Sequence, residues 1–209
     1  MTEYIYKAKI EHNKKTIESL FRTQYYAYEK TRILIRFIVG IALIIISVGV
    51  TLPIWLRGVL LLIGTWIVSS PDFPAQVKTD KVIQARKGNF PNMTYEFYGD
   101  RIKLYDNNSY NKNILYKELT RIIHDKKYFY LFLDKNSACM IDKESLLNQD
   151  SEKFMQFIEN KTGITWHVQK SIFSINIKDI LNISGILREK AYVIFILIAF
   201  VKSNKIAKI

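Results

Sequence analysis

Two apolar runs separated by five residues constrain this chain more than any other feature of its sequence. The first, Phe37–Leu52, holds no charged residue, and extending it back to Ile33 gives twenty residues in which Arg36 is the sole charge. Twenty helical residues span about 30 Å, the thickness of a hydrocarbon core. A soluble domain of this size rarely hides a helix that is apolar on every side. We therefore predict a membrane-spanning helix here.

The second run, residues 58–69, is too short to span alone and becomes long enough when residues 53–56 are added. Pro53 interrupts a helix and Trp55 suits the interface, so residues 53–57 are predicted to form a tight turn between two spans. A re-entrant loop is the alternative for the second run. Either way, one hydrophobic hairpin is expected, with Arg57 near its outer end.

The formal net charge of +12 is unevenly placed along the 209 residues. Residues 1–36 hold eight Lys and Arg against four Asp and Glu, and residues 171–209 hold six against two, whereas residues 71–170 hold sixteen against thirteen. The excess positive charge in these two terminal segments favours a lipid bilayer as partner, because nucleic acid would require a basic stripe on the folded domain. Lys and Arg also flank both ends of the hairpin, which predicts a multi-pass plasma-membrane protein with both ends cytoplasmic.

Shorter elements are expected on either side of the hairpin. Residues 3–10 alternate in polarity as a half-buried strand does, and Asn13 can cap a following helix. After the hairpin, Pro74 suits a first helical turn and Gly88 a helix end. A final helix is expected to open at Ser151 and stop at Gly163. Between these helices, strands are predicted at 94–98, 101–105, 114–123, 128–133 and 138–142.

These elements predict an α+β membrane protein in which a small antiparallel sheet or half-barrel is closed by the C-terminal helix. The predicted segments are an N-terminal strand and helix (1–32), the transmembrane hairpin (33–70), a cytoplasmic β domain with its closing helix (71–167), and a tail (168–209). The tail contains a short apolar stretch, residues 191–201, which could span, lie on the membrane or pack on the hairpin.

Three segments of the predicted β domain share a pattern of apolar and aromatic residues. They are EFYGDRIKLYD at Glu96–Asp106, the run KKYFYL at Lys126–Leu131, and the end of the last strand at Ile141–Lys143. Together with the helix that follows, these segments resemble the YcxB-like family of bacterial membrane proteins, and the resemblance covers roughly residues 1–166. It implies a transmembrane hairpin with a C-terminal β domain similar to bacterial pleckstrin-homology-like domains. The family has no agreed activity, so the resemblance supplies no site residues.

Catalytic and metal-binding chemistry finds little support in the sequence. His12, His124 and His167 lie in separate regions without a partner at ligand spacing, and Cys139 alternates with apolar neighbours as a small buried residue does. One cysteine forms no internal disulfide and no zinc pair. We therefore expect no catalytic residue, no metal site and no cofactor.

The expected function is that of a non-enzymatic, membrane-anchored interaction or regulatory module. Its partners would be the bilayer together with another protein or a second copy of the chain, and self-protection against a membrane-active toxin would fit the same architecture. The alternative is a membrane enzyme or accessory factor acting on lipid. Six basic residues could contact anionic lipid, although a solvated turn is the favoured role for the last two of them. These candidates are Lys78, Lys81, Arg86, Lys87, Lys126 and Lys127.

Overall fold

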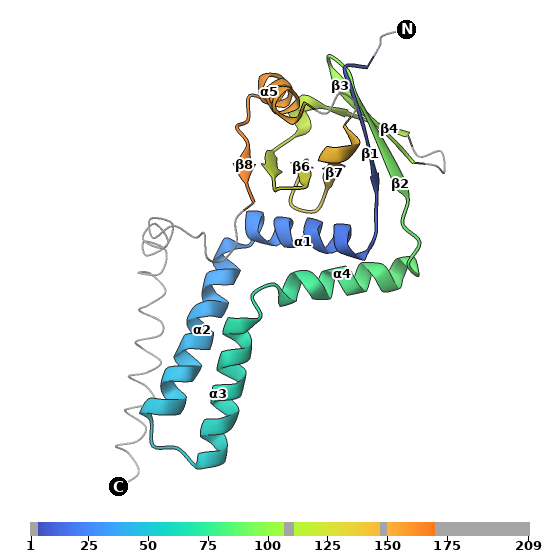
Figure 1. Cartoon of the computed structure of the whole chain (residues 1–209). Helices are drawn as coiled ribbons and strands as arrows, with labels where there is room; N and C mark the ends of the chain where they lie inside the picture. Colours follow the sequence, from blue (N-terminus) through green and yellow to red (C-terminus); the bar gives the residue numbers. More distant parts are fainter. Residues whose placement is uncertain (1–3, 107–110, 147–149, 170–209) are drawn as a thin grey trace. The chain divides into compact units, whose positions relative to one another are not determined.

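The computed structural model describes residues 4–106, 111–146 and 150–169. The tail from residue 170 onward, including the apolar stretch at 191–201, lies outside these described residues. Figure 1 shows two long helices that run side by side away from the β strands. They are α2 (Lys30–Gly49) and α3 (Ile54–Ser69), which together form the predicted hairpin.

The connection within the hairpin differs from the predicted turn at 53–57. Helix α2 ends at Gly49, and α3 already begins at Ile54 with Pro53 as its N-cap residue. The carbonyl oxygen of Pro53 accepts hydrogen bonds from the backbone N–H groups of Leu56 and Arg57. Proline lacks an N–H and has a preset φ, so it is tolerated at a helix start, and here it initiates the second helix.

Two further helices join the hairpin to the strands. Asn13 caps the first of them, as the sequence predicts, and the structure shows a capping box between Asn13 and Thr16. The second has Pro74 in its first turn and ends at left-handed Lys87 and Gly88, whose φ values are +49° and +74°. These helices are α1 (Lys14–Tyr28) and α4 (Phe73–Arg86), and α4 is bent by 73° relative to α3.

The strands form two four-stranded sheets, ordered β1-β2-β3-β4 and β7-β6-β5-β8. All neighbours are antiparallel except β5 and β8. The predicted strand at 114–123 is interrupted by a 3-10 turn at Tyr116–Glu118, so its two halves belong to different sheets. The strands are β1 (Tyr6–Glu11), β2 (Asn92–Phe97), β3 (Arg101–Asp106), β4 (Asn111–Leu115), β5 (Arg121–His124), β6 (Tyr128–Phe132), β7 (Ala138–Asp142) and β8 (His167–Val168).

The pairing of β1 with β2 decides how the hairpin is attached. These two strands are antiparallel neighbours, with Tyr6 opposite Phe97 and Glu11 opposite Asn92. Everything between them in the chain, including α1, α2, α3 and α4, is therefore an excursion from one sheet. The chain leaves the sheet at β1 and returns to the adjacent strand, so two covalent connections hold the hairpin to the β domain.

The core lies between the two sheets and α5 (Ser151–Thr162). Phe154 of α5 is fully buried, and its ring packs against Phe97 of the first sheet at 5.0 Å and Phe129 of the second at 5.1 Å between centroids. Aromatic contacts of this kind join both sheets to the helix. The helix begins at Ser151 and ends at left-handed Gly163, as predicted. Its N-cap is Asp150, whose carboxylate accepts from the Lys153 N–H. The observed architecture is α+β with antiparallel sheets.

Candidate functional site

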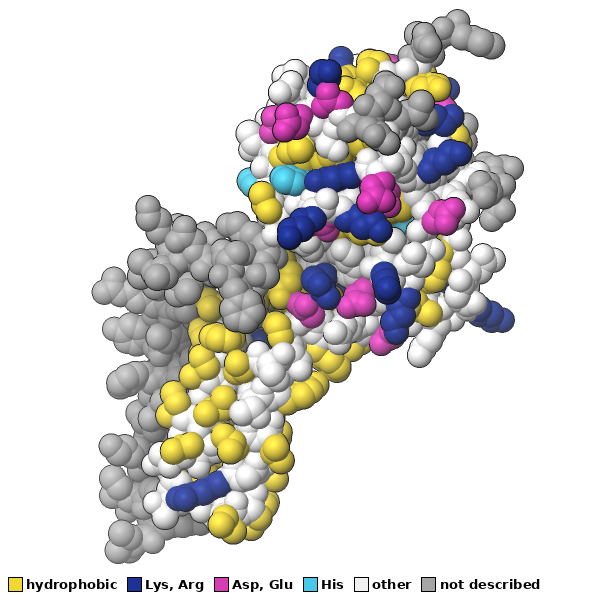
Figure 2. All heavy atoms as spheres, in the orientation of Figure 1, with side chains coloured by type: hydrophobic (Ala, Val, Ile, Leu, Met, Phe, Trp, Pro, Cys, Tyr) yellow, Lys and Arg dark blue, Asp and Glu magenta, His cyan; other side chains and the backbone are white. Residues whose placement is uncertain are grey.

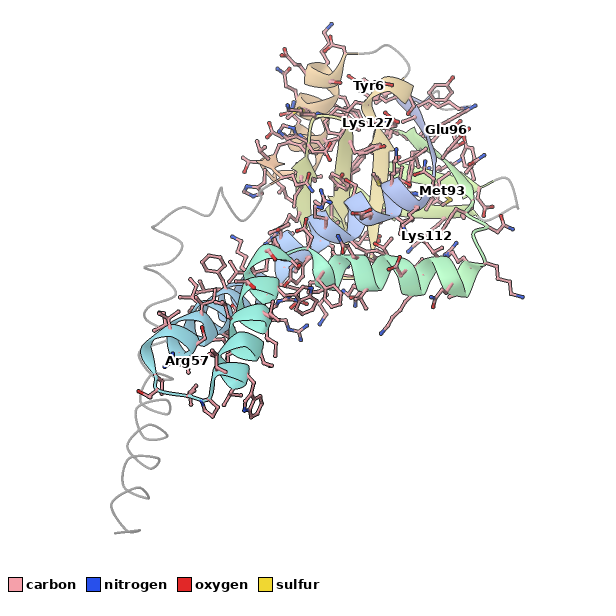
Figure 3. The ribbon with its side chains drawn as sticks, turned by 60° about the horizontal axis from the view of Figure 1, so that its bottom comes forward. Tyr6, Arg57, Met93, Glu96, Lys112 and Lys127 are labelled. Carbon is pink, nitrogen blue, oxygen red and sulfur yellow. The ribbon has the colours of Figure 1, made fainter. Side chains whose placement is uncertain are left out.

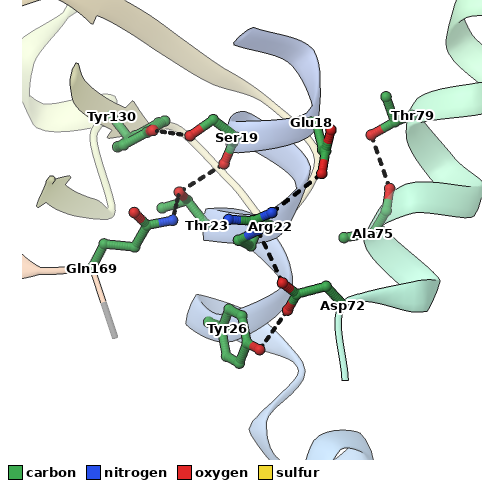
Figure 4. Close-up of polar contacts among 10 residues, drawn as sticks. All are labelled: Glu18, Ser19, Arg22, Thr23, Tyr26, Asp72, Ala75, Thr79, Tyr130 and Gln169. Atoms are coloured by element: carbon green, nitrogen blue, oxygen red, sulfur yellow. Dashed lines mark hydrogen bonds and ion pairs between the residues drawn. The ribbon is translucent and has the colours of Figure 1, made fainter. Parts of the chain in front are cut away.

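Helices α1 and α4 are joined by polar contacts close to the hairpin base. The hydroxyl of Tyr26 donates to Asp72 Oδ1 at 2.5 Å, and Arg22 forms an ion pair with Asp72 Oδ2 at 3.1 Å (Figure 4). Burial and this hydrogen bond to Asp72 raise the pKa of Tyr26. Because Asp72 directly precedes α4, it ties the start of that helix to the side of α1.

An adjoining part of the same face of α1 is held against the second sheet. Ser19 Oγ lies 2.7 Å from the hydroxyl oxygen of Tyr130, and the Gln169 side-chain amide donates to Thr23 Oγ1 at 2.6 Å (Figure 4). The guanidinium of Arg121 donates to the carbonyl oxygen of Ala27. Helix α1 therefore contacts both the β domain and α4, and it sets the position of the hairpin relative to the strands.

A cleft of about 370 Å³ opens where the end of α1, the start of α2 and the start of α4 meet. We call it the elbow cleft. It lies at the base of the hairpin, at the end opposite Arg57, which Figure 3 shows at the hairpin tip. The cleft is lined by Tyr25, Glu29, Arg32, Ile35, Arg36, Pro74, Ala75 and Lys78.

Three cations and one carboxylate line the elbow cleft. Arg32 forms an ion pair with Glu29 at 3.1 Å, within one helical turn. Arg36 donates one hydrogen bond to the carbonyl oxygen of Ser70 at 3.3 Å. Lys78 is exposed and forms no ion pair with a described residue. The cleft is therefore net positive, and part of its donor capacity is uncommitted.

Tyr25 adds a buried hydroxyl to this cleft. The residue is 8% exposed, and among the described residues its hydroxyl has no hydrogen-bond partner. Burial raises the pKa of Tyr25, while the nearby Arg36 charge lowers it and Glu29 raises it. Arg36 and Glu29, two of the charged groups that shift the pKa of Tyr25, also line the cleft. A buried donor without an acceptor destabilises the folded state.

The sequence-predicted lipid contacts divide between two places. Lys78 lines the elbow cleft, whereas Lys81, Arg86 and Lys87 are exposed further along or just after α4. Lys126 and Lys127 lie in the exposed turn between β5 and β6, where Asp125 Oδ1 accepts from the Lys127 N–H at 2.7 Å. Figure 3 shows Lys127 far from Arg57. Tyr25, Arg32 and Arg36, which also line the cleft, were not among the contacts predicted from the sequence.

Among the residues considered for catalysis, His124 and His167 lie on paired strands, with His167 opposite Ile123. Cys139 is buried, and burial raises the pKa of its thiol to about 12, so it is a thiol at neutral pH. Burial, together with the charge of Lys143, lowers the pKa of His124. Within the described ranges, no group of three or more His, Cys, Asp or Glu residues is placed to hold a metal ion.

Comparison with known protein families finds a match to part of the chain. The model of the family described as YcxB-like protein matches residues 97–158. The match runs from the last residue of β2 into α5, and it confirms over this segment the resemblance noted from the sequence. No curated protein and no solved structure matches the chain.

Proposed function

We propose that this protein is a non-enzymatic, membrane-anchored interaction module. In this proposal α2 and α3 insert as a hairpin and hold the β domain at the inner surface of the plasma membrane. The domain then presents its surface to a protein partner or to a second copy of the chain. A pleckstrin-homology-like arrangement of the β domain, with α5 closing the core, is part of the same proposal.

The location of exposed apolar side chains carries this proposal. Of the 21 large hydrophobic residues exposed in the described chain, 17 lie between Ile35 and Phe73. Figure 2 shows hydrophobic side chains over the hairpin, and Lys, Arg, Asp and Glu concentrated over the remainder of that face. Helix α2 is long and apolar enough to span a bilayer, and only 17% of its most apolar window is buried. An apolar surface of this extent is expensive in water and stable in lipid.

The length of α2 and the charges of the hairpin support insertion. The twenty residues of α2 correspond to about 30 Å and the sixteen of α3 to about 24 Å. Arg57 at the tip donates to the carbonyl oxygen of Val50 at 3.1 Å, and its long side chain can reach the headgroups. Cations are more numerous at the base, which favours a cytoplasmic β domain.

The anchoring part of the proposal is tested by charge substitution on the hairpin. Ile45 and Leu62 are 64% and 71% exposed, so Ile45→Asp with Leu62→Asp should disturb insertion more than folding of the β domain. A central Asp costs roughly 2.5–3.5 kcal/mol on insertion scales. The matched control is Leu115→Asp with Val168→Asp, two exposed apolar positions in the β domain.

The wild type and the control are expected to resist alkaline extraction from membranes, while the hairpin variant should be extracted or degraded. Equal membrane retention of both variants would contradict anchoring by α2 and α3. The interaction part is tested separately, by photo-crosslinkers at exposed Lys112 and Lys117 in intact membranes. A reproducible protein neighbour, or a crosslinked second copy, would support the module, and turnover of lipid by the purified chain would instead favour the enzyme alternative.

A further inference from the structure

We infer that the elbow cleft binds the phosphate group of one acidic phospholipid. Arg32, Arg36 and Lys78 supply the positive charge that pairs with this phosphate. The hydroxyl of Tyr25 donates an additional hydrogen bond to it. This inference rests on the proposed membrane anchoring and adds to it a ligand class and a defined site.

The charge balance of the cleft fits an anion. Among the described residues that line it, Glu29 is the one carboxylate, and this group is already paired with Arg32 at 3.1 Å. The hydrogen bond from Arg36 to Ser70 uses one of the five donors of a guanidinium, and the remaining donors can meet phosphate oxygens in a bidentate manner. Lys78 approaches the same space from α4, so cations from two different helices converge on it.

The unpartnered hydroxyl of Tyr25 supplies an independent observation. Its side chain lines the cleft, the residue is only 8% exposed, and the hydroxyl finds no acceptor among the described residues. A phosphate oxygen is a strong acceptor that would satisfy this donor. With its hydroxyl bonded to a phosphate oxygen, Tyr25 would keep its ring packed edge-on against Tyr26, at 5.8 Å between centroids.

The surroundings favour a lipid phosphate over free phosphate. Ile35 and Pro74 line the cleft beside the cations, and exposed Phe37 and Phe73 lie close to these lining residues in the chain. A diacyl lipid could therefore place its phosphate in the cleft and lay its acyl chains along the apolar hairpin. A volume of about 370 Å³ lies within the range of small-ligand sites.

The test uses the full chain in detergent, so that it does not depend on membrane insertion. Water-soluble short-chain phosphatidylglycerol is titrated, and bound lipid is counted by native mass spectrometry, with short-chain phosphatidylcholine as the zwitterionic comparison. The variants are Arg32→Gln with Lys78→Gln, and Tyr25→Phe. The control, Lys112→Gln with Lys117→Gln, removes the same charge from exposed positions outside the cleft.

Phosphatidylglycerol should bind more tightly than phosphatidylcholine. The double cleft variant should weaken its binding about tenfold or more and Tyr25→Phe about threefold, whereas the control should stay within about twofold of wild type. Equal binding by the double cleft variant and the control would overturn the inference, even if the chain resists alkaline extraction. Displacement of the lipid by an equal concentration of inorganic phosphate would assign the cleft to free phosphate and overturn the lipid assignment.

Discussion

Gly40 and Gly64 meet where α2 crosses α3, and the contact is between backbones. A Cβ atom built on Gly64 would lie 2.9 Å from the carbonyl oxygen of Gly40, and one on Gly40 would lie 2.7 Å from Val68 Cγ2. Small residues at such a crossing let two helices approach closely, as is common for helices in membranes. The hairpin is therefore a packed pair of helices.

This contact gives the first prediction. Gly64→Ala should destabilise the hairpin by about 1–3 kcal/mol, because the added methyl group must push the two backbones apart. Gly58→Ala in the same helix is the control, since a Cβ there meets nothing within 4 Å. Thermal unfolding of the detergent-solubilised chain measures both. Equal midpoints for the two variants would show that the helices do not pack as described.

Asp72 is predicted to be the main polar link between α1 and α4. Asp72→Ala removes the acceptor of Tyr26 and the ion partner of Arg22, and should cost about 2 kcal/mol. Asp80→Ala, a substitution within α4, is the control. Asp80 is exposed and lies 3.6 Å from Lys14, so its loss should cost no more than about 0.5 kcal/mol. Chemical denaturation compares the two. A larger loss of stability for Asp80→Ala than for Asp72→Ala would show that the main polar link lies at Asp80 and not at Asp72.

Local sequence signals predicted the helices well. The cap at Asn13, the stop at Gly163 and the start near Pro74 each depend on a few neighbouring residues, and the structure confirms them. The hairpin helices follow from uninterrupted apolar runs. Pro53 was the exception, because a proline between two apolar runs fits a break and a helix start equally well, and only the structure distinguishes them.

Non-local pairing could not be predicted in the same way. The partner of β1 lies more than eighty residues away, and nothing in the alternation of Ala8 and Ile10 identifies it. The two-residue strand β8 is too short to give a pattern. The elbow cleft combines residues from three helices, and the only sequence signal for it was the gathering of Arg32 and Arg36 near the start of the apolar run.

Cys139 is predicted to be unreactive in the folded protein. Its side chain is buried and burial raises the pKa of its thiol, so an alkylating reagent finds neither access nor thiolate at neutral pH. Mass spectrometry should detect alkylation only after denaturation. Cys139→Ala and His124→Ala should both retain partner crosslinking. Rapid native alkylation, or loss of crosslinking in a variant that remains folded, would give one of these residues a functional role.

The stability of the fold should fall at mildly acidic pH. Burial and the charge of Arg86 lower the pKa of His12, and burial and Lys143 lower that of His124. Below the ordinary value of 6.5 the unfolded chain therefore binds more protons than the folded chain, so the free energy of unfolding decreases as pH falls from 6.5 through the lowered pKa values.

Thermal unfolding across this pH window checks the prediction. His12→Gln should reduce the slope of stability against pH, since the Nδ1 atom of His12 is buried without a hydrogen-bond partner among the described residues. A slope that is unchanged in the variant, or stability that rises on acidification, would show that His12 is not held in its neutral form.

Cysteine accessibility tests membrane anchoring and orientation most directly. In a Cys139→Ala background, single cysteines are placed at Ile54, at the start of α3 near the hairpin tip, and at exposed Asn113 in the β domain. An impermeant thiol reagent added to intact cells should label the Ile54→Cys protein and should label the Asn113→Cys protein only after lysis. Labelling of Asn113→Cys in intact cells, with Ile54→Cys protected until lysis, would contradict a cytoplasmic β domain held by a membrane-spanning hairpin.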